Sequence, residues 1–120
     1  MSRTESQEMY LETILVLSKK KPVVRAVDIA AELNISKASV SLATKNLKEM
    51  NYITVTAEGY IYLAETGMEI AGTIYERHLA ITKVLTQIGV PADVAEQDAC
   101  RIEHVISEIT FDAIKKHSGL

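Results

Sequence analysis

The segment CRIEH, residues 100–104, carries three side chains of types that bind metal ions in proteins. Cys100, Glu103 and His104 stand at positions i, i+3 and i+4, so a helix would place all three on one face. Thiolate, carboxylate and imidazole groups are all metal ligands. The plainer alternative is a half-buried helix in which Cys100 is a small apolar residue and the other two side chains lie at the surface.

Other segments contain further residues that could bind the same ion. Met9 and Glu12 are three residues apart near the N-terminus, His78 stands in a long helical stretch, and Glu96 precedes Cys100 by one turn. If these segments meet in the fold, soft and hard ligands surround one cavity. Taken singly, a methionine is explained by core packing and a histidine by a structural hydrogen bond.

Three helices are expected in the first half of the chain, where they would carry the first of these residues. Apolar periodicity and chain breakers predict them over residues 4–18, 26–33 and 37–50. Ser36 ends the turn between the second and third helices, and serine is a favoured N-cap residue.

A β-hairpin is expected directly after these helices. Residues 52–56 and 60–63 are rich in β-forming residues, and Ala57-Glu58-Gly59 between them suits a tight turn. Three helices followed by a hairpin is the order of a winged helix-turn-helix, and an unrelated small α+β domain is the alternative.

The second half of the chain is predicted to be helical. Helices are expected over residues 66–88 and 92–106, with Pro91 in the first helical position, and a last helix after Ser107. Aliphatic helices in so short a half usually need a partner surface, which predicts a homodimer. The expected fold is mainly α with a small β-wing: a winged helix over residues 1–64 and a helical metal-binding and dimerisation domain over residues 65–120.

The charge is unevenly distributed along the 120 residues. The net charge of −3 argues weakly against nucleic acid, but residues 1–60 carry +1 and residues 61–120 carry −4. Seven of the 13 Lys and Arg residues fall in residues 19–48, where Asp28 and Glu32 are the only acidic residues. A basic surface in one half and an acidic second half indicate two different partners.

Composition also predicts where the protein works. No apolar run is long enough to span a bilayer, the N-terminus lacks the apolar stretch of a signal peptide, and one cysteine cannot form an internal disulfide. These features predict a cytoplasmic protein without a membrane partner.

The second helix of a helix-turn-helix inserts its N-terminal part into the major groove of DNA. Here the small side chains from Ser36 onward let the backbone approach the bases. Lys37 can reach guanine acceptors, Ser39 can bond to several bases, and Ala38 or Leu42 can touch a thymine methyl group. Four further residues are predicted to contact phosphates: Arg25, Ser41, Lys45 and Lys48. A solvated, serine-capped helix is the alternative.

The chain resembles the diphtheria-toxin-repressor family of metal-dependent transcriptional repressors, which includes the manganese regulators. The resemblance covers residues 4–117 and is carried by EMYLETI, VVRAVDIAAELNISKASVSLATKNLKEMNYI, the wing, LAETG and DACRIEHVIS. It implies a winged helix followed by a helical dimerisation domain, and binding of double-stranded operator DNA when Fe(II) or Mn(II) is present. No C-terminal SH3-like domain is expected, as in the shorter manganese regulators. Leu42 replaces a glutamine of the best-known iron repressor, so the operator sequence does not transfer.

The resemblance implies a primary metal site. Met9, Cys100, Glu103 and His104 match the ligands of this regulatory site in the iron-responsive branch of the family. Such a site would join the first helix to the CRIEH segment and would fix the spacing of two recognition helices.

A possible second metal site also follows from the resemblance. His78 matches a histidine of the ancillary site, whereas Thr82 and Glu96 replace its glutamate and second histidine. Glu12 matches a ligand of the manganese branch, so a second ion is expected among Glu12, His78 and Glu103 or Glu96.

Thioether and thiolate ligands favour an ion softer than Mn(II), so Fe(II) is the first expectation and Mn(II) the second. Co(II), Ni(II) and Zn(II) are expected to bind in vitro. The sequence therefore predicts a repressor that Fe(II) or Mn(II) activates to bind a palindromic operator and to control metal homeostasis genes.

Two other functions are considered. The first is a winged-helix regulator that senses oxidation of Cys100 or an organic ligand. The second is an enzyme that uses Cys100 and His104 as nucleophile and base. An enzyme is not expected, because the two residues share one helix and no Gly-rich oxyanion loop is present.

Overall fold

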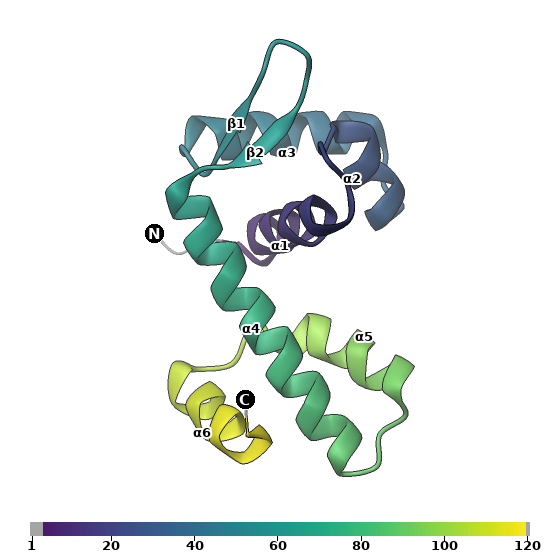
Figure 1. Cartoon of the computed structure of the whole chain (residues 1–120), viewed down its shortest axis with the longest axis vertical. Helices are drawn as coiled ribbons and strands as arrows, with labels where there is room; N and C mark the ends of the chain where they lie inside the picture. Colours follow the sequence, from purple (N-terminus) through teal and green to yellow (C-terminus); the bar gives the residue numbers. More distant parts are fainter. Residues whose placement is uncertain (1–3, 120) are drawn as a thin grey trace. The chain divides into compact units, whose positions relative to one another are not determined.

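The computed structural model describes residues 4–119, which form two compact units (Figure 1). The N-terminal unit ends at Gly72 and the C-terminal unit begins at Thr73. This division falls within helix α4 (Glu65–Gln87), whereas the sequence placed the boundary between residues 64 and 65, at the beginning of that helix.

The N-terminal unit contains three helices followed by a two-stranded sheet, as the sequence predicted. The elements are α1 (Glu5–Lys20), α2 (Ala26–Leu33), α3 (Lys37–Glu49), β1 (Ile53–Val55) and β2 (Ile61–Leu63). The helix ends agree with the predicted ones to within two residues, while the strands are shorter. The fold is mainly α with a small β-wing, and it is a winged helix-turn-helix.

Local capping explains where these helices begin. The Thr4 hydroxyl accepts a hydrogen bond from the Gln7 backbone N–H, and the Gln7 side chain accepts one from the Thr4 N–H, both at 3.1 Å. This reciprocal pair satisfies donors that the first turn of α1 would otherwise leave free. Ser36 caps α3 in the predicted manner, because its Oγ accepts from the Ser39 N–H at 3.1 Å. Asn34 ends α2 in the left-handed conformation at φ 55°.

The hairpin is antiparallel, with Thr54 opposite Tyr62 at its centre. Gly59 adopts φ +86° in the turn, a conformation that favours glycine. Beyond the hairpin, the Ile61 N–H donates to the carbonyl of Val24 at 2.8 Å, which ties the wing to the segment before α2.

Aliphatic side chains from every element form the core of the N-terminal unit. The valine, leucine and isoleucine side chains with at most 3% exposure are Leu11, Ile14, Leu17, Val24, Ile29, Val40, Leu47, Ile53 and Ile61. Their burial from helices and strands together holds the wing against the helices, since burying each such side chain contributes roughly 1.5–3 kcal/mol.

The C-terminal unit packs α5 (Ala92–Ile102) and α6 (Glu108–Ser118) on either side of α4 (Figure 1). Ala95 and Ala99 are fully buried, and such small residues let α5 approach its neighbour closely. Ser107 caps α6 as predicted, because its Oγ accepts from the Thr110 N–H at 3.2 Å. Pro91 immediately precedes the first residue of α5 instead of being that residue.

The predicted helix over residues 92–106 is too long, because α5 ends at Ile102. Glu103 is the C-cap residue and His104 lies in the following turn. One local and one tertiary constraint accompany the early end. Ser107 must be extended (ψ 161°) to cap α6, and the side chain of Arg77 on α4 donates to the carbonyls of Glu103 and Ile106.

Among residues 4–119, no helix combines the length and the apolar character that crossing a bilayer would require.

Two glycines of α4 give a matched test of the packing at its N-terminal end. A Cβ at Gly67 would collide with the carbonyl oxygen of Tyr52, which accepts a hydrogen bond from the Ala64 N–H. A Cβ at Gly72 would meet nothing within 4 Å. We therefore expect Gly67→Ala to lower the free energy of unfolding by about 1–3 kcal/mol, as overpacking does. Gly72→Ala should raise it by roughly 0.5–1 kcal/mol through helix propensity. Urea denaturation followed by circular dichroism measures both, and equal effects would contradict the close approach at Gly67.

Candidate metal centre and DNA-facing surface

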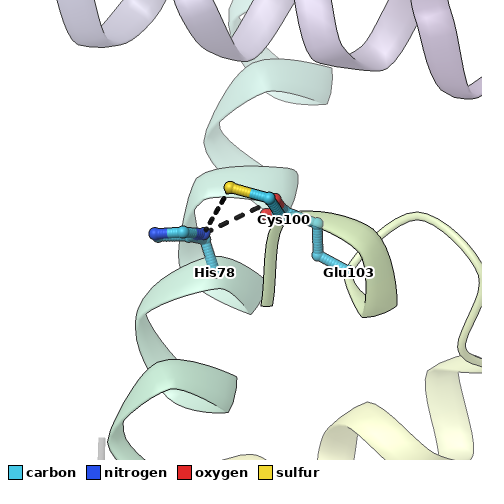
Figure 2. Close-up of side chains that lie close together, drawn as sticks. All are labelled: His78, Cys100 and Glu103. Carbon is cyan, nitrogen blue, oxygen red and sulfur yellow. Dashed lines mark hydrogen bonds and ion pairs between the residues drawn. The ribbon is translucent and has the colours of Figure 1, made fainter. Parts of the chain in front are cut away.

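Three potential metal ligands meet between α4 and the end of α5 in the C-terminal unit. Figure 2 shows His78 from α4 facing Cys100 and Glu103. The His78 Nδ1 atom lies 3.8 Å from the Cys100 Sγ and 3.5 Å from the Glu103 Oε1. One potential ligand atom from each of the three side chains lies within 4.8 Å of the other two. Ligand atoms bound at about 2.0–2.3 Å to one tetrahedral ion are separated by roughly 3–4 Å. The spacing therefore suits a single ion.

The Glu103 carboxylate is the most unusual group in this cluster. Its side chain has no exposed surface, and neither oxygen accepts a hydrogen bond from any residue that the structure describes. The nearest groups are two imidazoles: Nδ1 of His78 at 3.5 Å and Nε2 of His104 at 3.9 Å from Oε1. A buried carboxylate without hydrogen bonds is costly unless a cation neutralises it. The site therefore favours a cation next to the Glu103 carboxylate.

The electrostatics of His78 agree with this view. The contacts of the His78 ring with the Cys100 sulfur and then with the Glu103 carboxylate favour the protonated ring and raise the pKa of His78 from 6.5 to about 10, although burial opposes the shift. A protonated ring therefore supplies the positive charge in the metal-free protein. A bound divalent ion would take the place of that proton, because a ligating imidazole nitrogen must be free of hydrogen.

The cluster crosses the division into two sites that the resemblance implied. Cys100 was predicted for the primary site, His78 for the second, and Glu103 for the primary site with a possible share in the second. The exposed Glu96 lies 3.9 Å from Nε2 of His78, on the ring nitrogen that does not face Cys100 and Glu103. Glu96 therefore does not approach the same His78 nitrogen as the other two.

Three further predicted ligands are not members of the His78–Cys100–Glu103 cluster. His104 approaches Glu103 but is not grouped with Cys100, because the helix that would have aligned the two ends at Ile102. Met9, with 42% exposure, and Glu12 both lie on α1 in the N-terminal unit.

Sequence reasoning did not single out Arg77, which precedes His78. Its Nη1 donates to the carbonyl oxygens of Glu103 and Ile106, each at 3.2 Å. The only signal in the sequence was a basic residue beside a candidate ligand, and that signal is weak without knowledge of where α5 ends.

The predicted DNA-facing residues share one property, which is exposure to solvent. This holds for Arg25, Ser36, Lys37, Ala38, Ser39, Ser41, Leu42, Lys45 and Lys48. The Ser36 and Ser39 hydroxyls are 2.9 Å apart and bond to each other, so both are already engaged in capping α3. Ser41, Lys45 and Lys48 line an open depression between α3 and the hairpin.

Arg25, which is predicted to contact a phosphate, is bound by Tyr60 of the wing. Its guanidinium lies 4.9 Å from the centre of the Tyr60 ring, and its Nη2 donates to the Tyr60 hydroxyl at 3.1 Å. This contact presents a fixed positive charge beside the turn of the hairpin.

Family descriptions match almost the whole chain. Residues 3–60 match the N-terminal DNA-binding domain of iron-dependent repressors, and residues 64–119 match their metal-binding and dimerisation domain. The chain belongs to the diphtheria-toxin-repressor family. The three-residue cluster falls in the segment matched by the metal-binding domain of this family of transcriptional regulators, and α3 falls in the segment matched by the DNA-binding domain.

Individual relatives come from both branches of the family. The transcriptional regulator MntR of Escherichia coli O157:H7 is 33% identical over 113 residues, which cover 94% of this chain and 73% of MntR. The iron-dependent repressor IdeR of Mycobacterium tuberculosis H37Rv is 30% identical over 105 residues, which cover 87% of this chain and 46% of IdeR.

A solved structure shows the same fold. The manganese regulator SloR superposes with a TM-score of 0.83 at 23% identity, over 99% of this chain and 55% of SloR. This chain thus spans about half the length of SloR and of IdeR.

The two glutamates near His78 allow a controlled test of the centre. We expect Glu103→Gln to weaken Co(II) binding by at least about 100-fold, because losing a ligand should cost more than the 10–100-fold of losing a residue that only supports one. Glu96→Gln removes the same charge from an exposed side chain and should weaken binding by less than about fivefold. Isothermal titration with Co(II) measures both affinities. Equal losses would show that general negative charge, and not ligation by Glu103, binds the ion.

Proposed function

We propose that this chain is a transcriptional repressor that binds operator DNA as a homodimer when Fe(II) or Mn(II) occupies the His78–Cys100–Glu103 centre. One observation carries the proposal: a fully buried carboxylate without hydrogen bonds faces an imidazole and a thiol, in the segment that matches the metal-binding domain of a repressor family.

The roles of the residues follow from their chemistry. His78 would bind through Nδ1, Cys100 as a thiolate and Glu103 through a carboxylate oxygen, which provides three ligands from two helices. A bound ion supplies positive charge and directional bonds that hold the end of α5 to α4. Regulation then depends on how much better the ion binds the DNA-competent arrangement than other arrangements. A coupling free energy of about 1–3 kcal/mol is the usual size of such an effect.

The choice between metals rests on Cys100. A thiolate favours Fe(II) over Mn(II), whereas Glu103 and His78 accept either ion. Relatives named for iron and for manganese both resemble this chain, so the ligand set is the stronger argument. We place Fe(II) first and Mn(II) second.

The DNA side of the proposal rests on α3 and the wing. The exposed N-terminal part of α3 can enter the major groove, and Arg25, Lys45 and Lys48 would neutralise phosphates. Two copies would present two such helices about one DNA turn apart, roughly 34 Å, which suits a palindromic operator. Control of metal homeostasis genes is the matching physiological role.

Several sequence predictions stay predictions within this proposal. Met9 and His104 are expected to complete the primary ligand set, Glu12 and Glu96 are possible members of a second site, and the cytoplasm is the expected location.

The proposal is tested by metal-dependent DNA retention. A pool of random DNA duplexes is incubated anaerobically with the protein and Fe(II), the retained sequences are amplified, and their mobility shift is measured before and after chelator. We expect retention only with metal, and a palindromic consensus. His78→Ala should abolish the metal response, whereas His117→Ala, an exposed histidine on α6, should preserve it. Retention that ignores metal and chelator would contradict the proposal and favour sensing through Cys100 oxidation or an organic ligand.

The metal preference has its own test. We expect Cys100→Asp to shift activation toward Mn(II), since a hard carboxylate replaces a soft thiolate. The measurement compares the Fe(II) and Mn(II) concentrations that give half-maximal DNA retention. Cys100→Ser, which also removes the thiolate but adds no charge, is the control and should weaken the response to both ions. An unchanged ratio in the Asp variant would show that Cys100 does not set the preference.

A further inference from the structure

Arg77 joins the candidate ligand segment to two helices of the C-terminal unit. It stands next to His78 on α4, and its Nη1 donates to the carbonyl oxygens of Glu103 and Ile106, each at 3.2 Å. Its guanidinium carbon also lies 5.3 Å from the centre of the Phe111 ring on α6. Because Phe111 is only 5% exposed, this cation–π contact is largely shielded from water.

The hydrogen bonds of Arg77 serve a defined need. A helix leaves its last carbonyl groups without partners inside the helix. Arg77 donates to the carbonyl of Glu103, the C-cap residue of α5, and to the carbonyl of Ile106 in the segment that follows. The main chain of Glu103 is thereby anchored to the residue adjacent to His78, so two of the three candidate ligands are linked through one side chain.

Arg77 contacts the main chain of Glu103 and not its carboxylate. None of the ion pairs described for residues 4–119 joins the two charged groups, and both carboxylate oxygens stay without a hydrogen bond. An arginine paired with the carboxylate would compete with a bound cation. The observed arrangement instead fixes the position of Glu103 and leaves its oxygens available.

We infer that Arg77 is a positioning residue of the metal centre: it sets the place of the Glu103 carboxylate relative to His78 and couples that place to the packing of Phe111 on α6. This inference rests on the proposed function, since it needs an ion at the centre. Two other roles for Arg77 predict different results. A residue that only stabilises the fold would leave ion affinity unchanged in the folded protein, and a residue that acts mainly by its charge would weaken binding by repulsion.

The experiment uses Co(II) as the probe, because a cobalt–thiolate bond gives visible absorption. Affinity, absorption spectrum and thermal unfolding are measured for wild type, Arg77→Ala and Arg77→Lys. The control is Lys115→Ala. Lys115 also links α6 to α4, through Glu76 at 2.9 Å, but this exposed pair does not touch the ligand segment.

We expect Arg77→Ala to lower Co(II) affinity by about 10–100-fold and to alter the absorption spectrum, as losses of supporting residues do. Arg77→Lys keeps the positive charge but lacks the planar guanidinium group with its several N–H donors. Its Co(II) affinity should lie between those of Arg77→Ala and wild type. Lys115→Ala should bind as wild type does. If Arg77→Ala does not fold, the lysine variant decides the question by its own loss of about 3–10-fold at unchanged helix content.

The outcomes separate this inference from the proposed function. Wild-type protein that binds Co(II) with thiolate absorption, together with equal or tighter binding by the folded Arg77 variants, overturns the role of Arg77 and leaves the metal-dependent repressor intact. Wild-type protein that gives no thiolate absorption with Co(II) overturns both.

Discussion

The central constraint in the C-terminal unit is a buried carboxylate that accepts no hydrogen bond from the described residues. Glu103 has no exposed surface and no hydrogen bond to either oxygen from the described residues, and it is flanked by the rings of His78 and His104. Burying such a group is unfavourable unless positive charge accompanies it. Because its pKa is raised, the His78 ring holds a proton and supplies that charge. The neighbouring Cys100 thiol adds a metal ligand, which neutralisation by a proton alone would not require. On the proposed function, this combination would favour a bound cation, and a transition metal would suit the three ligands better than Ca²⁺ or Mg²⁺.

The elements around this carboxylate are arranged by ordinary helix chemistry. Buried Ala95 and Ala99 let α5 pack closely, the early end of α5 turns Glu103 into a cap residue, and Ser107 begins α6 five residues after Ile102. Arg77 donates to the carbonyl of the C-cap residue Glu103 and to that of Ile106 before α6. Similar contacts order the N-terminal unit, because the Ser36 cap fixes the beginning of α3 and the Arg25–Tyr60 contact holds Arg25 beside the turn of the hairpin.

The sequence predicted the elements well, and helical spacing accounted for only part of the three-residue cluster. Helix ends with local signals, such as Thr4, Ser36 and Ser107, were placed to within about two residues because capping depends on neighbours in the chain. The end of α5 was placed four residues too late because it depends on Arg77, a residue 26 positions before Glu103 in the sequence. The pairing of Cys100 with Glu103 followed from helical spacing. The addition of His78 to that pair, and the complete burial of Glu103, could not follow from spacing, since both result from the packing of α4 against α5.

The location of a bound ion tests the central claim most directly. Protein loaded anaerobically with Co(II) can be crystallised and the metal located by its anomalous scattering. The account predicts one ion bonded to Nδ1 of His78, Sγ of Cys100 and a carboxylate oxygen of Glu103, at roughly 2.0–2.3 Å from each. An ion bound elsewhere, with the Glu103 oxygens still unligated in the loaded protein, would contradict it.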